Sequence, residues 1–262
     1  MQIKANGIEV NCELSGNRDG QVVMMSHSLG SSLMMWNPQM PALAEKYRIL
    51  RYDTRGHGAT SAPRGPYAMN TLVDDALALL DALDIDQVHW MGLSMGGMIG
   101  QGLALQSQQR LCSLLLCDTM AVIREQTKEM WRNRIHSSER FGLHKVVDFA
   151  MERWFTEPFR SDENDEYAAI REQFLATPVA GYVGCCYAIY SMNFLDELAA
   201  IELPTHIIVG DADLATPVAE SQAIAERIKG ATLDIIPDAA HLSNIEQAEI
   251  FNQSLLKFLS SL

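Results

Sequence analysis

An α/β fold, with a mostly parallel central sheet and helices on both faces, is predicted by two features of the sequence. Apolar, strand-like runs alternate along the chain with segments whose apolar residues recur at helical spacing. The chain also has 262 residues, 48% of them hydrophobic and 20% charged, which is enough to bury one large core. We therefore expect a single α/β core, interrupted once where the alternation breaks at 120–199.

The predicted strands and helices follow from the local pattern of apolar and polar residues. Strand-like apolar runs lie at 8–14, 22–25, 47–52, 88–91, 111–117, 205–210 and 232–236. Helices are expected at 71–83, after the glycine-rich run at 92–97, at 218–228 and at 246–259. Helical spacing is clearest at 71–83, where apolar residues such as Leu72 and Leu80 oppose the polar Asp74 and Asp81.

The segment 120–199 is rich in helix formers, aromatic residues and charge, and it contains no strand-like run. It follows the run at 111–117, and we predict a helical insertion after the sixth strand of the sheet. Helices inserted there cover the carboxyl ends of the strands, where a lid shapes a pocket and excludes water. We predict a core formed by 1–119 and 200–262 and a helical lid formed by 120–199.

The run Gly92-Leu93-Ser94-Met95-Gly96 is a G-x-S-x-G motif between a predicted strand and a predicted helix. In that setting the motif forms a sharp turn that lifts the serine hydroxyl clear of the sheet. Glycines are needed where the strand and the helix approach closely. The sequence therefore predicts Ser94 as a nucleophile, with the free N–H groups of the following helix directed at the reacting carbonyl.

A serine nucleophile needs a general base, and the base needs an acid that orients it. His241 lies in a loop of small residues after the last predicted strand, and we predict it as the base. The loop after the strand at 205–210 offers Asp211 and Asp213, and we predict that Asp213 is the acid and Asp211 braces the turn. Asp118, after the strand at 111–117, is the alternative acid.

The oxyanion formed during acyl transfer needs two backbone donors. One predicted donor is the N–H of Met95, which follows Ser94. The other lies in the loop after the strand at 22–25, where position favours the N–H of Leu29. His27, in the same loop, is expected to brace it.

Composition argues against several classes of protein. The formal net charge of −13 opposes binding to nucleic acid or to an anionic membrane surface. No apolar run approaches the roughly 20 residues of a membrane span, and the first residues lack the apolar stretch of a signal peptide, so a cytoplasmic protein is expected. The five cysteines show no zinc-site spacing, and we expect reduced thiols, no metal and no cofactor.

Together these residues are typical of an α/β hydrolase, and further motifs narrow the resemblance. These motifs are His27-Ser28-Leu29-Gly30, Trp36, 51–58, Gly65-Pro66-Tyr67, 92–97, Arg153-Trp154-Phe155-Thr156, Gly181-Tyr182 with Cys186, Ala215-Thr216-Pro217 and 241–247. Through them, and over almost its full length, the chain resembles the 3-oxoadipate enol-lactonase family. The Arg153 to Thr156 and 241–247 motifs are the most specific of these.

The resemblance implies a serine hydrolase that opens a five-membered enol-lactone bearing a carboxymethyl group, without a cofactor or a metal. The substrate carboxylate then needs a cation, for which Arg134 is the candidate, one helical turn from Trp131. Trp154 is the candidate for an apolar wall of the pocket. A short-chain carboxylesterase with the same three catalytic residues is the main alternative, and a perhydrolase-like enzyme is a second.

Overall fold

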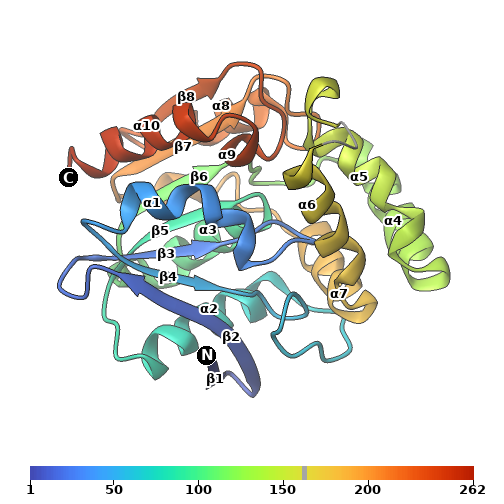
Figure 1. Ribbon diagram of the computed structural model, residues 1–262, viewed down its shortest axis with the longest axis horizontal. Helices are drawn as coiled ribbons and strands as arrows, with labels where there is room; N and C mark the ends of the chain where they lie inside the picture. Colours follow the sequence, from blue (N-terminus) through green and yellow to red (C-terminus); the bar gives the residue numbers. More distant parts are fainter. Residues whose placement is uncertain (161–163) are drawn as a thin grey trace.

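The computed structural model describes residues 1–160 and 164–262, and an eight-stranded sheet forms its centre (Figure 1). The strands lie in the order β1-β2-β4-β3-β5-β6-β7-β8. Their bounds are Gln2–Ala5 (β1), Ile8–Gly16 (β2), Val22–Ser26 (β3), Arg48–Tyr52 (β4), Val88–Leu93 (β5), Leu111–Cys117 (β6), Thr205–Gly210 (β7) and Thr232–Ile236 (β8). Within the described residues the β1–β2 and β2–β4 pairs are antiparallel and the other five pairs are parallel, so the predicted mostly parallel sheet is confirmed.

Helices pack on both faces of this sheet. Their bounds are Met40–Leu43 (α1), Met69–Ala82 (α2), Met95–Ser107 (α3), Lys128–Phe141 (α4), Val147–Trp154 (α5), Asp165–Ala176 (α6), Val179–Tyr190 (α7), Val218–Arg227 (α8), Ser243–Glu246 (α9) and Ala248–Leu259 (α10). Contacts join α1 to α10 and α2 to α3, and Figure 1 shows the first pair in front of the sheet and the second pair behind it. All residues of β5 and β7 are buried, as expected for strands covered on both faces.

Two elements differ from the sequence prediction. The strand β1 was not predicted, although it pairs with β2 through Asn6-Gly7, and both residues have positive φ (45° and 76°). Asn-Gly is the strongest short hairpin signal, and it identifies this turn. The predicted helix at 246–259 begins as the short α9 and is then interrupted at Gln247, whose φ of −127° and ψ of 51° are not helical.

The chain between β6 and β7 contains α4, α5, α6 and α7, which Figure 1 shows grouped beside one end of the sheet. The two ends of this segment are held together, because Val122 forms an isolated antiparallel bridge with Asn193. The Phe194 N–H also donates to the Ala121 carbonyl at 2.8 Å. The helical segment therefore leaves and rejoins the core at one place. Among the described residues, every helix is too short or too polar to cross a lipid bilayer.

Candidate active site

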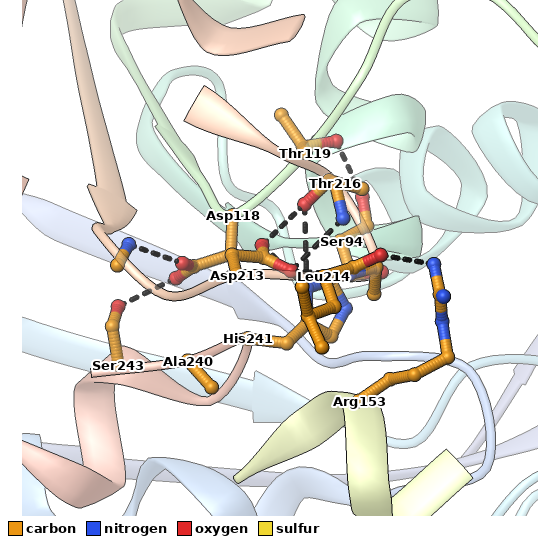
Figure 2. Close-up of polar contacts among 12 residues, drawn as sticks. Ser94, Asp118, Thr119, Arg153, Asp213, Leu214, Thr216, Ala240, His241 and Ser243 are labelled. Carbon is orange, nitrogen blue, oxygen red and sulfur yellow. Dashed lines mark hydrogen bonds and ion pairs between the residues drawn. The ribbon is translucent and has the colours of Figure 1, made fainter. Parts of the chain in front are cut away.

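Ser94 occupies a strained turn between β5 and α3. Its φ of 54° and ψ of −113° lie in a region that L-residues rarely adopt. Two hydrogen bonds hold the turn in place: the Ser94 N–H donates to the Cys117 carbonyl at 2.8 Å, and the Thr119 hydroxyl donates to the Ser94 carbonyl at 2.7 Å. Residues at the end of β6 and just after it thus fix the backbone on both sides of the serine, and Figure 2 shows the bond from Thr119.

The two glycines of the motif make this turn possible. A β-carbon on Gly92 would lie 2.1 Å from the carbonyl oxygen of Gly96. A β-carbon on Gly96 would lie 2.0 Å from the carbonyl oxygen of Ser26 in β3. No side chain fits at either position, because these distances are far below van der Waals contact.

The loops after β7 and β8 bring Asp213 and His241 together, although 28 positions separate them in the sequence. The Nδ1 atom of His241 lies 2.9 Å from Oδ2 of Asp213, and their side chains are 2% and 0% exposed. A carboxylate at Nδ1 leaves Nε2 of the ring as the free, basic nitrogen. Figure 2 shows both side chains beside Ser94.

Asp213 is held as an ionised acceptor. Its Oδ1 accepts from the N–H groups of Ala215 (2.6 Å) and Thr216 (2.9 Å), and its Oδ2 accepts from the Thr216 hydroxyl at 2.6 Å. Burial by itself raises the pKa of Asp213, but His241 and these hydrogen bonds outweigh burial and hold that pKa below its usual range. Asp211, by contrast, is exposed to solvent.

Asp118, the alternative acid, is fully buried and makes different contacts. Its Oδ1 accepts from the Gly210 N–H at 2.9 Å, and its Oδ2 accepts from the Ser243 hydroxyl at 2.6 Å. Burial, and then the neighbouring charge of Asp213, raise the pKa of Asp118 well above its usual range. Asp118 therefore ties the loop that carries Asp213 to the loop that carries His241, and it makes no hydrogen bond with His241 itself.

Ser94 and His241 line the same cavity, which has a volume of about 180 Å³. The other lining residues come from the loop after β3, from α3, from the segment between β6 and β7 and from the loop after β7: Ser28, Leu29, Met98, Met120, Thr127, Met130, Trp131, Arg134, Arg153, Trp154, Ile189, Ala215 and Thr216. No direct hydrogen bond joins Ser94 to His241. Such bonds are often long without substrate and tighten when it binds.

The two backbone N–H groups predicted as oxyanion donors, those of Leu29 and Met95, can be located in the structure. Met95 is the first residue of α3, so its N–H has no partner within the helix. Leu29 lines the cavity, and its N–H donates to no acceptor within residues 1–160 and 164–262. The next residue, Gly30, has a positive φ of 77°, and its N–H donates to Nε2 of His57 at 2.8 Å.

Two buried histidines form hydrogen bonds that hold the loop after β3, which carries Leu29. Nε2 of His27 accepts the Thr54 N–H at 2.9 Å, and its Nδ1 therefore donates to the Ser28 carbonyl at 2.7 Å. His57 is held similarly, since its Nε2 accepts the Gly30 N–H and its Nδ1 donates to the Arg55 carbonyl at 3.2 Å. Each ring must be neutral to make both bonds. The brace predicted for His27 is therefore present, and His57 completes it.

We expect acid to weaken the fold through His57. Burial, and then the adjacent His27, lower the pKa of His57 to about 3, whereas an unfolded histidine titrates near 6.5. Below about pH 6.5 the unfolded chain therefore binds a proton at His57, whereas the same ring stays neutral in the folded protein. The free energy of unfolding falls as the pH drops from there towards 3. Urea unfolding at pH 7.5 and 5.5 should show His57→Gln losing about 1.4 kcal/mol less than the wild type over this interval. Equal losses in the two proteins would contradict this role.

Arg134 is half-buried and presents a cation to the cavity. Its guanidinium carbon lies 5.2 and 5.3 Å from the ring centroids of Trp131 and Tyr182, and its Nε donates to the Tyr182 hydroxyl. Its Nη2 is buried and has no hydrogen-bond partner within the described residues. A buried cationic donor without a partner is costly, and an anionic ligand in the cavity would satisfy it.

The end of α5 contacts the two loops that carry Asp213 and His241. The Trp154 ring lies 6.3 Å from the His241 ring, and the Trp154 carbonyl accepts the Leu242 N–H at 3.1 Å. Arg153 donates to the Leu214 carbonyl, next to Asp213. The predicted apolar wall at Trp154 therefore lies directly beside the histidine.

Comparison with known proteins places the chain in a family. The sequence pattern of the α/β hydrolase fold family matches residues 21–248. A 3-oxoadipate enol-lactonase of Acinetobacter baylyi is 35% identical over 253 residues, which cover 97% of this chain and 94% of that enzyme. This chain belongs to the 3-oxoadipate enol-lactonase family. A second enol-lactonase of the same bacterium is also 35% identical and covers 98% of the chain and 95% of its own length.

Solved structures agree with membership of the enol-lactonase family. The enol-lactonase of Burkholderia xenovorans superposes with a TM-score of 0.96 at 37% identity, covering 99% of this chain and all of that one. A malate-bound esterase of Thermogutta terrifontis superposes with a TM-score of 0.93 at 28% identity, covering 100% of this chain and 98% of its own. The α/β-hydrolase fold predicted from the sequence is thus confirmed.

Three residues of this candidate site were not singled out from the sequence. Tyr182 fixes Arg134, Thr216 bonds Asp213, and Glu246 accepts from both Thr156 and the Ala240 N–H. Tyr182, Thr216 and Glu246 all lie in motifs that carry the family resemblance. Those family motifs were the signal that could have identified the three residues, because no local sequence pattern indicates a contact between distant loops.

Proposed function

We propose that this protein is a serine hydrolase that opens a carboxylate-bearing enol-lactone, converting 3-oxoadipate enol-lactone to 3-oxoadipate. The family relationship supports the reaction class, and the names of the relatives supply the substrate. The single observation that carries the substrate class is Arg134, whose buried Nη2 lacks a partner within the described residues of the cavity that contains Ser94. That placement suits a small anionic ester or lactone.

In the first half of the reaction, His241 takes the proton of Ser94 while the hydroxyl oxygen attacks the lactone carbonyl. Asp213 keeps the proton of His241 on Nδ1 and stabilises the charged ring that forms. The N–H groups of Leu29 and Met95 hold the developing oxyanion. The ring opens with an enolate as leaving group, which His241 protonates and which then becomes a ketone.

In the second half, the acyl group remains on Ser94 and water must replace it. His241 takes a proton from that water, and the hydroxide attacks the acyl carbon within the same oxyanion hole. The bond to Ser94 breaks and its oxygen recovers the proton from His241. The product carries a new carboxylate, while Arg134 still holds the carboxylate that the substrate brought.

We also propose that 120–199 acts as a lid over a core formed by 1–119 and 200–262. Trp131, Arg134 and Trp154 all come from this segment, and all line the cavity beside Ser94. Since the lid supplies the cation and the aromatic walls, it determines which substrate the common catalytic residues meet.

Replacing Arg134 with methionine tests the substrate class. The methionine keeps an apolar stem, but the bond to the substrate carboxylate is lost. We expect kcat/KM for the enol-lactone to fall about 100-fold, or about 2.7 kcal/mol, as for other hydrogen bonds to a buried charge. The measurement compares kcat/KM for the enol-lactone with that for a neutral γ-lactone or methyl ester of similar size, for which we expect a change below about threefold.

The same comparison in the wild type tests the function itself. A preference of several orders of magnitude for the anionic enol-lactone supports the proposal. Comparable values for both substrates would reject the proposal in favour of a short-chain carboxylesterase. The apolar Met98, Met120 and Met130 of the cavity would also accommodate the neutral ester that such an enzyme hydrolyses.

A further inference from the structure

The cavity that contains Ser94 is lined by two arginines. Arg134 comes from α4 and Arg153 from α5, and both line the cavity together with Ser94 and His241. Within residues 1–160 and 164–262 neither guanidinium forms an ion pair with a carboxylate. Two cations gathered at one small cavity stand out in a chain whose formal net charge is −13.

The two guanidiniums are held in place by different partners. Arg134 lies near the rings of Trp131 and Tyr182, and its Nη2 has no partner within the described residues. Arg153 donates through Nη2 to the Leu214 carbonyl and lies over the Phe149 ring at 5.3 Å, and within residues 1–160 and 164–262 its other donors have no acceptor. Burial, and then repulsion by Arg134, lower the pKa of Arg153, which places the two charges within electrostatic reach of each other.

The proposed reaction makes a second carboxylate, which is a suitable ligand for Arg153. The enol-lactone carries one carboxylate. Hydrolysis breaks the bond between the acyl carbon and the ring oxygen, adds water, and converts the acyl group into a second carboxylate with release of one proton. The substrate therefore neutralises one guanidinium, and only the product neutralises two.

We propose that the cavity is a two-point dicarboxylate site, in which Arg134 holds the carboxylate of the substrate and Arg153 receives the carboxylate made at Ser94. This inference rests on the proposed function. It predicts that short linear dicarboxylates compete with substrate and that the enzyme is inhibited by its own product. The cavity of about 180 Å³, equivalent to about six water molecules, suits such a compact ligand.

The test compares adipate with hexanoate, which has six carbons but one carboxylate. Binding is measured by calorimetry to the Ser94→Ala protein, so that turnover is not required. We expect adipate to bind at least tenfold more tightly than hexanoate, and either Arg134→Met or Arg153→Met to remove most of that preference. Arg153→Lys, which keeps the charge, should retain part of it. Arg132→Met is the matched control, because Arg132 is exposed on the same helix as Arg134, and it should bind adipate as the parent does.

Equal binding of adipate and hexanoate would overturn the inference, as would an unchanged adipate affinity in Arg153→Met. Either result can be told apart from failure of the proposed function. An enzyme that strongly prefers the anionic enol-lactone but binds both acids equally keeps the function and loses the dicarboxylate site. Competitive inhibition of p-nitrophenyl acetate hydrolysis by adipate, in the wild type, provides an independent check that the ligand occupies the cavity of Ser94.

Discussion

Replacing Ser94 with alanine is expected to lower kcat for the enol-lactone by about 10⁴-fold or more. The substitution removes the only oxygen in the strained turn that can form the acyl-enzyme, whereas the oxyanion donors and the cavity remain. Alanine differs from serine only by that oxygen, and the hydrogen bonds that fix the turn use the backbone of residue 94. Single-turnover kinetics with the purified variant measures the residual rate.

The fold must survive for this result to be informative. We expect the melting temperature of Ser94→Ala to equal or slightly exceed that of the wild type, because within the described residues the hydroxyl makes no hydrogen bond that stabilises the turn. Residual activity above about 1% of the wild type, in a protein free of wild-type contamination, would show that Ser94 is not the nucleophile.

Much of the fold can be predicted from the sequence, because the apolar residues that are buried follow the spacing of each strand or helix. The strands β5, β6 and β7 are covered on both faces and appear as continuous apolar runs. The turn at Ser94 is only partly local, since Gly92 is required by the nearby Gly96 carbonyl, whereas Gly96 is required by the carbonyl of Ser26 in β3. The strand β1 was missed because it is short and lies at the edge of the sheet, where one face needs no apolar residues.

The candidate site is harder to predict because it is assembled by the fold. The bond between Arg134 and Tyr182 joins α4 to α7 across 48 positions, and no spacing rule connects the two residues. The same holds for Asp118, which links the loops after β7 and β8 through backbone and hydroxyl groups. The residue types that chemistry requires can be listed from the sequence, but their partners depend on how the loops meet in space.

Replacing Asp213 with asparagine is expected to lower kcat by about 10⁴-fold, because the amide does not hold the His241 ring in the required tautomer. Asp213 lies 2.9 Å from Nδ1 of His241, and an amide nitrogen placed there can donate to Nδ1 and force the proton onto Nε2. Nε2 is then unable to accept the proton of Ser94. The measurement is kcat of the purified Asp213→Asn variant beside that of the wild type at neutral pH.

Asp118→Asn separates this effect from simple loss of a buried carboxylate. An asparagine at 118 can still accept the Gly210 N–H through oxygen and donate to the Ser243 hydroxyl through nitrogen, so the two loops stay joined. We therefore expect Asp118→Asn to retain kcat within about tenfold of the wild type, since it preserves the hydrogen bonds that matter. If Asp118→Asn were the more damaging of the two, the acid would lie after β6, and the bond between Asp213 and His241 would serve only to position the loops.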